Sequence, residues 1–190
     1  MATSGSKNFE PDVGEFIEEA FERCGIELRT GYDLKTAQRS LNLLLAEWSN
    51  RGLNQWTVNQ KTVAMVEDTT VYNIDSTNAT APIDVLDAFI RETTNSVITD
   101  LPMTRISRAE YSSYPSKSTT GKPNQFMVDK QLSPTITVFP APDKSSTYTI
   151  YMNVLTRMDD ADVGSNTMQM PYRFYPCLAA GLAYYISLKK

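Results

Sequence analysis

Two groups of carboxylates in the sequence have a spacing that could support chemistry, and the first is the acidic run 159–164 (DDADVG). Spaced carboxylates before a glycine can bind calcium. In a loop counted from Asp160, however, the places of an oxygen ligand, a glycine and a glutamate are taken by Gly164, Ser165 and Pro171. The run is therefore predicted to be a solvated acidic turn, and no metal site is expected.

The second group could perform acid–base chemistry at glycosidic bonds, which requires two carboxyl groups. Glu18 and Glu22 are one helical turn apart, but they fall on the polar face of a predicted helix and are expected to be exposed. Glu110 is the other candidate acid. The sequence has no histidine, which excludes Ser-His-Asp and Cys-His catalysis and histidine-bearing zinc sites. Nucleotide-binding glycine motifs are also absent from it, so neither an enzyme nor a cofactor is predicted.

The composition is that of a folded protein of modest size. The chain has 190 residues, of which 41% are hydrophobic and 21% charged, enough apolar material for one domain or one domain with an insertion. A net charge of −4 argues against a free-standing nucleic-acid binder. It is compatible with a protein surface that DNA passes without binding to it. No apolar run approaches the roughly 20 residues that span a bilayer. Cys24 and Cys177 are predicted to be buried free thiols.

Amphipathic helices are predicted at both ends of the chain, after a polar arm over 1–8. Apolar residues in 13–24 recur at helical spacing, and Gly25 offers a stop. A second helix is predicted from Asp33, as N-cap, to about residue 51, packed on the first as an antiparallel hairpin. A third begins near Pro171, with small residues that allow another helix to approach closely.

The middle of the chain changes to the period of β-strands. A short helix is predicted over 106–111, with Ser107 near its start. The first two strands are predicted to form a hairpin, because a short turn at 67–68 separates them. The predicted strands cover 57–66, 71–74, 83–93, 125–128, 135–139 and 148–155.

These elements predict an α+β fold: a small helical bundle from the N- and C-terminal helices, with an inserted antiparallel β-rich subdomain. The helices are apolar on one side only, so they can bury those sides against each other and bring the chain ends together. The predicted boundaries are 1–56 for the arm and two bundle helices, 57–158 for the insertion, and 159–190 for an acidic loop and the C-terminal helix.

Basic and aromatic side chains are the candidates for an interface. Residues 101–130 form the only basic segment of the sequence, and tyrosine combines an apolar ring with a polar tip that suits partly wet interfaces. The alternative is a solvated loop and surface tyrosines. The predicted interface residues are Arg105, Arg108, Lys117, Lys122, Tyr148, Tyr151, Tyr184, Lys189 and Lys190.

Segment 18–58 resembles the opening of head-to-tail adaptor proteins of tailed phages, including the tail tubular protein A type of short-tailed phages. The resemblance rests on Cys24-Gly25, the RSLNLLL core at 39–45, Trp48, Asn50-Arg51-Gly52 and Trp56. It continues in 101–103 (LPM), 106–108 (ISR), 110–111 (EY), 121–123 (GKP), 171–174 (PYRF) and 178–185 (LAAGLAYY). These motifs are structural and define no active site.

The resemblance implies a structural protein of the virion neck, made in the host cytoplasm, with no cofactor and no membrane. About twelve copies would form a ring between the portal and the tail nozzle or tube, with the genomic DNA passing through its centre. Two alternatives remain open: a virion-associated peptidoglycan-degrading enzyme that uses a carboxylate such as Glu110, and a baseplate or carbohydrate-binding module built on the β-rich middle.

Overall fold

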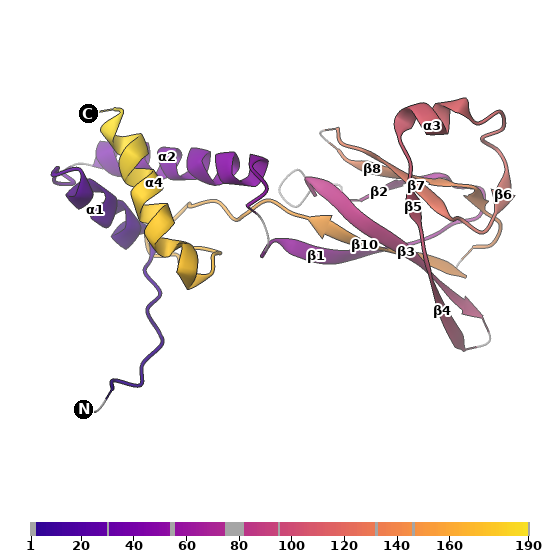
Figure 1. The fold of residues 1–190 in the computed structure, drawn as a ribbon, viewed down its shortest axis with the longest axis horizontal. Coiled ribbons are helices and arrows are strands. Elements are labelled where there is room, and N and C mark those ends of the chain that lie inside the picture. Colours follow the sequence, from indigo (N-terminus) through magenta and orange to yellow (C-terminus); the bar gives the residue numbers. More distant parts are fainter. Residues whose placement is uncertain are drawn as a thin grey trace. The chain divides into compact units, whose positions relative to one another are not determined.

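A computed structural model describes residues 3–29, 31–53, 56–74, 82–94, 96–131, 133–145 and 147–189. The fold is mixed α+β, as predicted, and its strands pair mainly antiparallel. Contacts divide the chain into two compact units (Figure 1). The helical unit consists of Met1–Trp56 and Met158–Lys190, and the β unit consists of Thr57–Arg157. None of the helices described has the length and apolarity to cross a membrane.

Helix α1 (Val13–Arg23) begins at a complete capping box. The Asp12 carboxylate accepts a hydrogen bond from the Glu15 N–H at 2.8 Å, and the Glu15 carboxylate accepts one from the Asp12 N–H at 3.0 Å. Gly25 follows the helix with a φ of 69°, a left-handed conformation that glycine adopts without strain. The predicted apolar stripe is confirmed, since its buried members are Val13, Phe16, Ile17, Ala20 and Phe21.

Helix α2 (Gly31–Asn50) begins earlier than predicted. Asp33 lies inside its first turn, so the prediction of Asp33 as N-cap is wrong. An acidic side chain suits either place, because the positive end of the helix dipole extends over the whole first turn. The helix ends where predicted, before Gly52, which has a φ of 80°. Its buried face consists of Ala37, Ser40, Leu41, Leu44 and Leu45.

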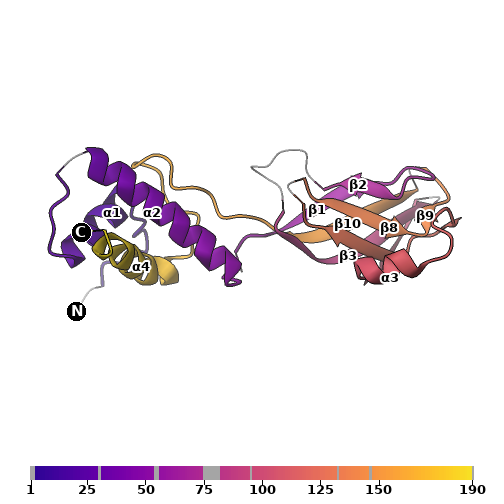
Figure 2. The same ribbon diagram turned by 90° about the horizontal axis from the view of Figure 1, so that it is seen from above.

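A 3₁₀ turn, η1 (Tyr172–Phe174), leads into helix α4 (Tyr175–Ser187), which packs against both α1 and α2 (Figures 1 and 2). These two contacts are more extensive than the direct contact of α1 with α2, so the predicted α1–α2 hairpin is not the main packing. Cys177 is exposed and Cys24 is half-buried, which corrects the prediction of two buried thiols; both are free. The face of α4 that is buried instead includes Tyr175, Leu178, Ala179, Leu182 and Ile186.

Gly181 is the point at which α4 approaches α2 most tightly. A Cβ atom added there would lie 2.9 Å from Cδ2 of Leu44. We expect Gly181→Val to lower the free energy of unfolding by about 1–3 kcal/mol, because the branched side chain overpacks this contact. The check is urea denaturation followed by tryptophan fluorescence. Gly181→Ala is the matched control: the Leu44 methyl can yield, and alanine gains about 1 kcal/mol of helix propensity. Equal stability of the valine variant and the natural protein would contradict the expectation.

The β unit contains two four-stranded sheets. The first has the order β1-β10-β3-β4, formed by Val58–Ala64, Tyr148–Leu155, Asp84–Thr94 and Val97–Pro102. The second has the order β2-β8-β7-β5, formed by Val71–Asn73, Thr135–Phe139, Gln125–Asp129 and Thr104–Arg105. A third, two-stranded sheet pairs β6 (Thr120–Gly121) with β9 (Ala141–Pro142). The predicted hairpin is therefore wrong, because β1 and β2 belong to different sheets.

The two four-stranded sheets are layered over one shared core (Figure 1). Alternation along β10 decides which side chains enter it: Tyr148, Ile150, Met152 and Val154 are buried, while the residues between them are half-buried. The second sheet contributes, among others, Phe126, Ile136 and Val138. The uncertain segment 83–93 is confirmed as a strand, because β3 pairs with both β10 and β4.

The short helix α3 (Arg108–Ser113) and Tyr114, which follows it, contact the end of β8 in the second sheet. The predicted role of Ser107 is confirmed, since its Oγ accepts the Glu110 N–H at 3.1 Å. The Tyr111 and Tyr114 rings both contact Phe139 of β8, with ring centroids 6.4 Å and 4.5 Å away. Tyr111 and Tyr114 thus cover the Phe139 ring at the end of β8.

Candidate interaction surfaces

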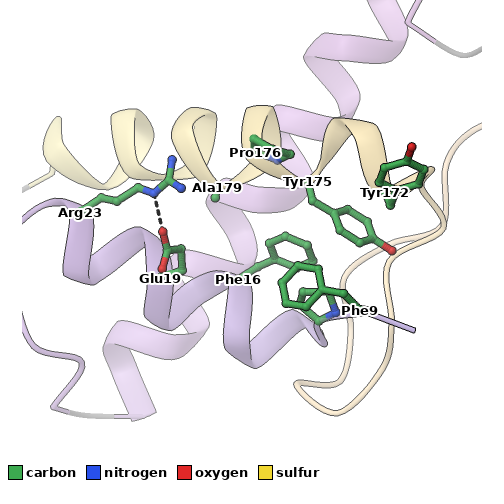
Figure 3. Close-up of a pocket in the computed structure, with 9 residues that line it drawn as sticks. Phe9, Phe16, Glu19, Arg23, Tyr172, Tyr175, Pro176 and Ala179 are labelled. Carbon is green, nitrogen blue, oxygen red and sulfur yellow. Dashed lines mark hydrogen bonds and ion pairs between the residues drawn. The ribbon is translucent and has the colours of Figure 1, made fainter. Parts of the chain in front are cut away.

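An apolar cavity of about 450 Å³ lies in the helical unit, between the start of α1 and the start of α4 (Figure 3). Phe16 and Tyr175 form its floor as an edge-to-face pair with centroids 5.1 Å apart. Phe9 and Tyr172 flank the opening, and both are exposed. The remaining lining residues are Pro11, Glu19, Arg23, Pro176 and Ala179.

This cavity is built for apolar contact and not for chemistry. Its charged residues, Glu19 and Arg23, lie one turn apart on α1 and pair with each other at 2.7 Å. The other lining residues bring aromatic, proline and alanine surface. The sequence did not reveal this site, because Phe16 belongs to the apolar stripe of α1, whereas Phe9, Tyr172 and Tyr175 lie outside the predicted helical repeats. The available signal was Phe9 directly after a polar arm, together with Tyr172 and Tyr175 around the start of α4.

The acidic run 159–164 contributes to a second, polar depression of about 520 Å³. Asp162 accepts hydrogen bonds from the Asn166 amide at 2.9 Å and from the Val163 N–H at 2.7 Å. These bonds lower the pKa of the Asp162 carboxyl below its usual range. Across the part of the chain that the structure describes, no group of three or more ligating side chains could hold a metal ion.

Most of the predicted basic interface residues are engaged inside the β unit. Arg105 pairs with Asp84 at 2.9 Å, Arg108 pairs with Asp129 at 2.6 Å, and Lys122 pairs with Glu92. Lys117 donates to two backbone carbonyls near the end of α3, those of Ser112 and Tyr114, and lies 5.6 Å from the Tyr111 ring centroid. Two carboxylates from outside segment 101–130, those of Asp84 and Glu92, thus offset part of its net positive charge. A role for these four side chains at an interface stays a prediction.

Asp84, at the start of β3, is the centre of this charge network. Its carboxylate accepts hydrogen bonds from Arg105 at 2.9 Å, from Lys130 at 2.7 Å and from the Val85 N–H at 2.8 Å. Partial burial acts to raise the pKa of Asp84, but the hydrogen bonds and the two positive charges outweigh it, so the pKa lies below its usual range. Asp84 is therefore expected to be ionised throughout the neutral and mildly acidic range.

We expect Asp84→Asn to lower the free energy of unfolding at pH 7 by about 1–2 kcal/mol, a figure kept small because both cations are partly exposed. Because the pKa of Asp84 is lower in the folded than in the unfolded protein, its ionised form stabilises the fold at pH values above the unfolded-state pKa. This stabilisation is lost as the pH falls through the folded-state pKa. The difference from the natural protein should therefore shrink below about pH 4. Urea unfolding at several pH values measures this stability difference, with Asp87→Asn as the control variant. A difference that does not change with pH would contradict the assignment.

The two predicted interface tyrosines of β10 have different environments. Tyr148 is 2% exposed, so its ring belongs to the core, where burial raises its pKa to about 12. This corrects its prediction as a contact residue: the even positions of β10 face inward. Tyr151 lies on the open face of the first sheet, stacked on Phe89 with centroids 5.0 Å apart. The Arg91 guanidinium lies 4.4 Å from the Tyr151 ring centroid and binds Asp100 through two hydrogen bonds of 2.7 Å.

The remaining predicted interface residues lie in the helical unit. Tyr184 is exposed on α4, and the Lys189 ammonium donates to the Ser40 hydroxyl at 2.5 Å, which joins the end of α4 to α2. Lys190 lies outside the described residues. The predicted interface set is therefore divided between the two units.

Glu110, the candidate acid of the enzyme alternative, lies exposed in the first turn of α3. A catalytic carboxylic acid usually has its pKa raised by a buried, apolar setting. The exposed side chain of Glu110 has no such buried setting. The position of Glu110 therefore gives no support to acid catalysis.

Comparison with known proteins identifies the family of the chain. No curated protein matches it significantly. The family model described as SU10 adaptor protein matches residues 12–189, which includes α1, α4 and the whole β unit. The particular similarity to tail tubular protein A stays a prediction. Because the match covers both units from the capping box of α1 to the end of α4, the chain belongs to the SU10 adaptor protein family and is a structural adaptor protein of a phage particle.

Proposed function

We propose that this protein is a head-to-tail adaptor whose copies form a ring between the portal and the tail nozzle or tube. The family match over residues 12–189 carries this proposal, because it extends over both units. About twelve copies would surround the DNA channel, matching a portal of the same symmetry. Assembly would take place in the host cytoplasm, and the ring would remain in the neck of the virion during DNA ejection.

The architecture supports a division of labour between the two units. We interpret the helical unit as a helical bundle, because residues from α1, α2 and α4 form one common core. The β unit, which the chain enters after Trp56 and leaves at Arg157, is then an inserted subdomain. We propose that the bundle contacts the portal and that the inserted subdomain contacts neighbouring subunits or the tail.

The charge of the chain supports passage of DNA without tight binding. The net charge is −4, and four of the five basic residues in segment 101–130 form ion pairs with carboxylates of the β unit. Tight binding to DNA depends on cations that replace the counterions of the phosphates. Cations already paired within the protein are poorly suited to that role, so the DNA can slide.

Electron microscopy of the purified protein, alone and mixed with its portal protein, tests this function. We expect mostly single subunits alone, and a ring of adaptor density on one face of the portal in the mixture. Class averages down the ring axis give the copy number, for which we expect about twelve. Absence of a ring on the portal, although both proteins are folded, would contradict the adaptor function; a ring with another copy number would contradict only the predicted symmetry.

A further inference from the structure

Among the described residues of the β unit, the two outer strands of the first sheet have a strand partner on one side only. The sheet order is β1-β10-β3-β4, so β1 and β4 are its edges. An edge strand presents a row of backbone N–H and C=O groups, which makes it a template for another strand. Soluble proteins usually protect such edges with charged side chains. The β4 edge instead exposes Val97 and Ile98, whose exposed fractions are 64% and 61%.

The directions of the strands make these two edges complementary. All three pairings in the sheet are antiparallel, and the number of strands is even, so β1 and β4 run in opposite directions. A second copy in the same orientation would therefore bring its β1 antiparallel to β4 and continue the alternation of the sheet. Such a contact uses a different surface on each copy, which is the heterologous type that builds rings.

The side chains also match across such a contact. Val63 of β1 faces the core, because it is opposite the buried Ile150. On β4, Leu101 is opposite the buried Ile90, so Val97, four residues away, points to the same side. Residues that pair directly across a sheet must share a face. A register that places Val63 opposite Val97 satisfies this condition and leaves both sheet faces continuous.

The same register brings further favourable pairs together. It places Thr62 opposite Ile98 on the open face, a second pair of β-branched side chains. Two residues further along each strand, on the same face, the Gln60 amide comes opposite Asp100, which already binds Arg91. A pairing of β4 with β4 would instead place two strands that each carry an aspartate side by side, and like charges across a sheet are unfavourable.

From this geometry we infer that β4 of each copy adds to β1 of the next, so that the first sheets of neighbouring subunits form one continuous β-belt. The partner of this surface is a second copy of the chain. The inference rests on the proposed ring, and it names the backbone surfaces that close it.

Disulfide cross-linking within the assembled ring tests the register. In a background of Cys24→Ser and Cys177→Ser, Val63→Cys with Val97→Cys on the same chain should give, after oxidation of rings formed on the portal, a ladder of covalent multimers on a denaturing gel. Val63→Cys alone should give none. The matched control is Val71→Cys with Val97→Cys, since Val71 is an exposed valine that lies in the other sheet. Dimers from Val97→Cys alone would show a β4–β4 contact and overturn the inference.

A second variant tests the edge without depending on the register. Val97→Lys with Ile98→Lys should leave the circular dichroism spectrum of the subunit unchanged and reduce the fraction of portals with a ring at least tenfold. Val71→Lys is the control and should leave ring formation intact. Rings that persist with the lysine edge, or rings of the Val63→Cys and Val97→Cys variant that give no ladder after oxidation, would overturn the β-belt while the adaptor function stands. Failure of the unaltered protein to form any ring would instead contradict the adaptor function itself.

Discussion

Leu182→Ala is expected to lower the free energy of unfolding of the helical unit by about 2–5 kcal/mol. Leu182 lies on α4 and is 0% exposed within the core shared with α1 and α2. Truncation removes the transfer free energy of the lost methyl groups and leaves a cavity that three helices cannot easily fill. The effect should exceed that of any surface substitution in this unit.

Tryptophan fluorescence during urea denaturation measures this effect selectively. The chain has two tryptophans, Trp48 and Trp56, and both pack against the helical core. Leu188→Ala is the matched control: it makes the same change just after α4, where the side chain is 68% exposed, and we expect less than about 0.5 kcal/mol. A Leu182→Ala variant as stable as this control would contradict the central place of α4 in the unit.

Phe126→Ala is expected to have a comparable effect in the β unit, about 3–5 kcal/mol. Phe126 lies on β7 and is 1% exposed, in the core between the two sheets. An aromatic ring this deeply buried fills space that backbone-paired strands cannot close. Loss of the ring should therefore weaken the β unit more than any other single truncation on β7.

Amide hydrogen exchange measures the result strand by strand. We expect protection to fall in β7, β8 and β10, while the tryptophan transition of the helical unit stays in place, since the two units have separate cores. Val71→Ala, at an exposed position on strand β2 of the same sheet, is the control and should change little. A shift of the tryptophan transition equal to the loss in the β unit would contradict the independence of the two cores.

The sequence predicted those features that depend on local periodicity. In 13–24 the apolar residues recur at helical spacing, and all but Cys24 are buried on α1. In 148–155 they alternate, and the even positions of β10 are buried. The partners of charged and aromatic side chains could not be predicted in this way, because ion pairing and exposure do not follow from residue type. Tyr148 is an exception, since the alternation in 148–155 alone indicates that its ring belongs to the core.

Pairings between distant segments could not be predicted in the same way. A two-residue turn made a β1–β2 hairpin the natural choice, yet β1 pairs with β10, which follows some 90 residues later. Periodicity indicates which face of a strand is buried, but it does not indicate which other strand pairs with it, because several strands have the same alternation. The ion pairs of Asp84 with Arg105 and Lys130 have the same origin, since their partners are adjacent only after the sheets form.

The sequence by itself determined the helices and strands, the buried side of most of them, and, through its motifs, the kind of protein that the family match later identified. These properties depend on interactions within a few residues, which the order of side chains specifies directly. Only the tertiary structure decided the strand order, the aromatic cavity at the start of α4 and the two open edges of the first sheet. Those features arise where distant segments meet, and which segments meet depends on how the whole core packs together.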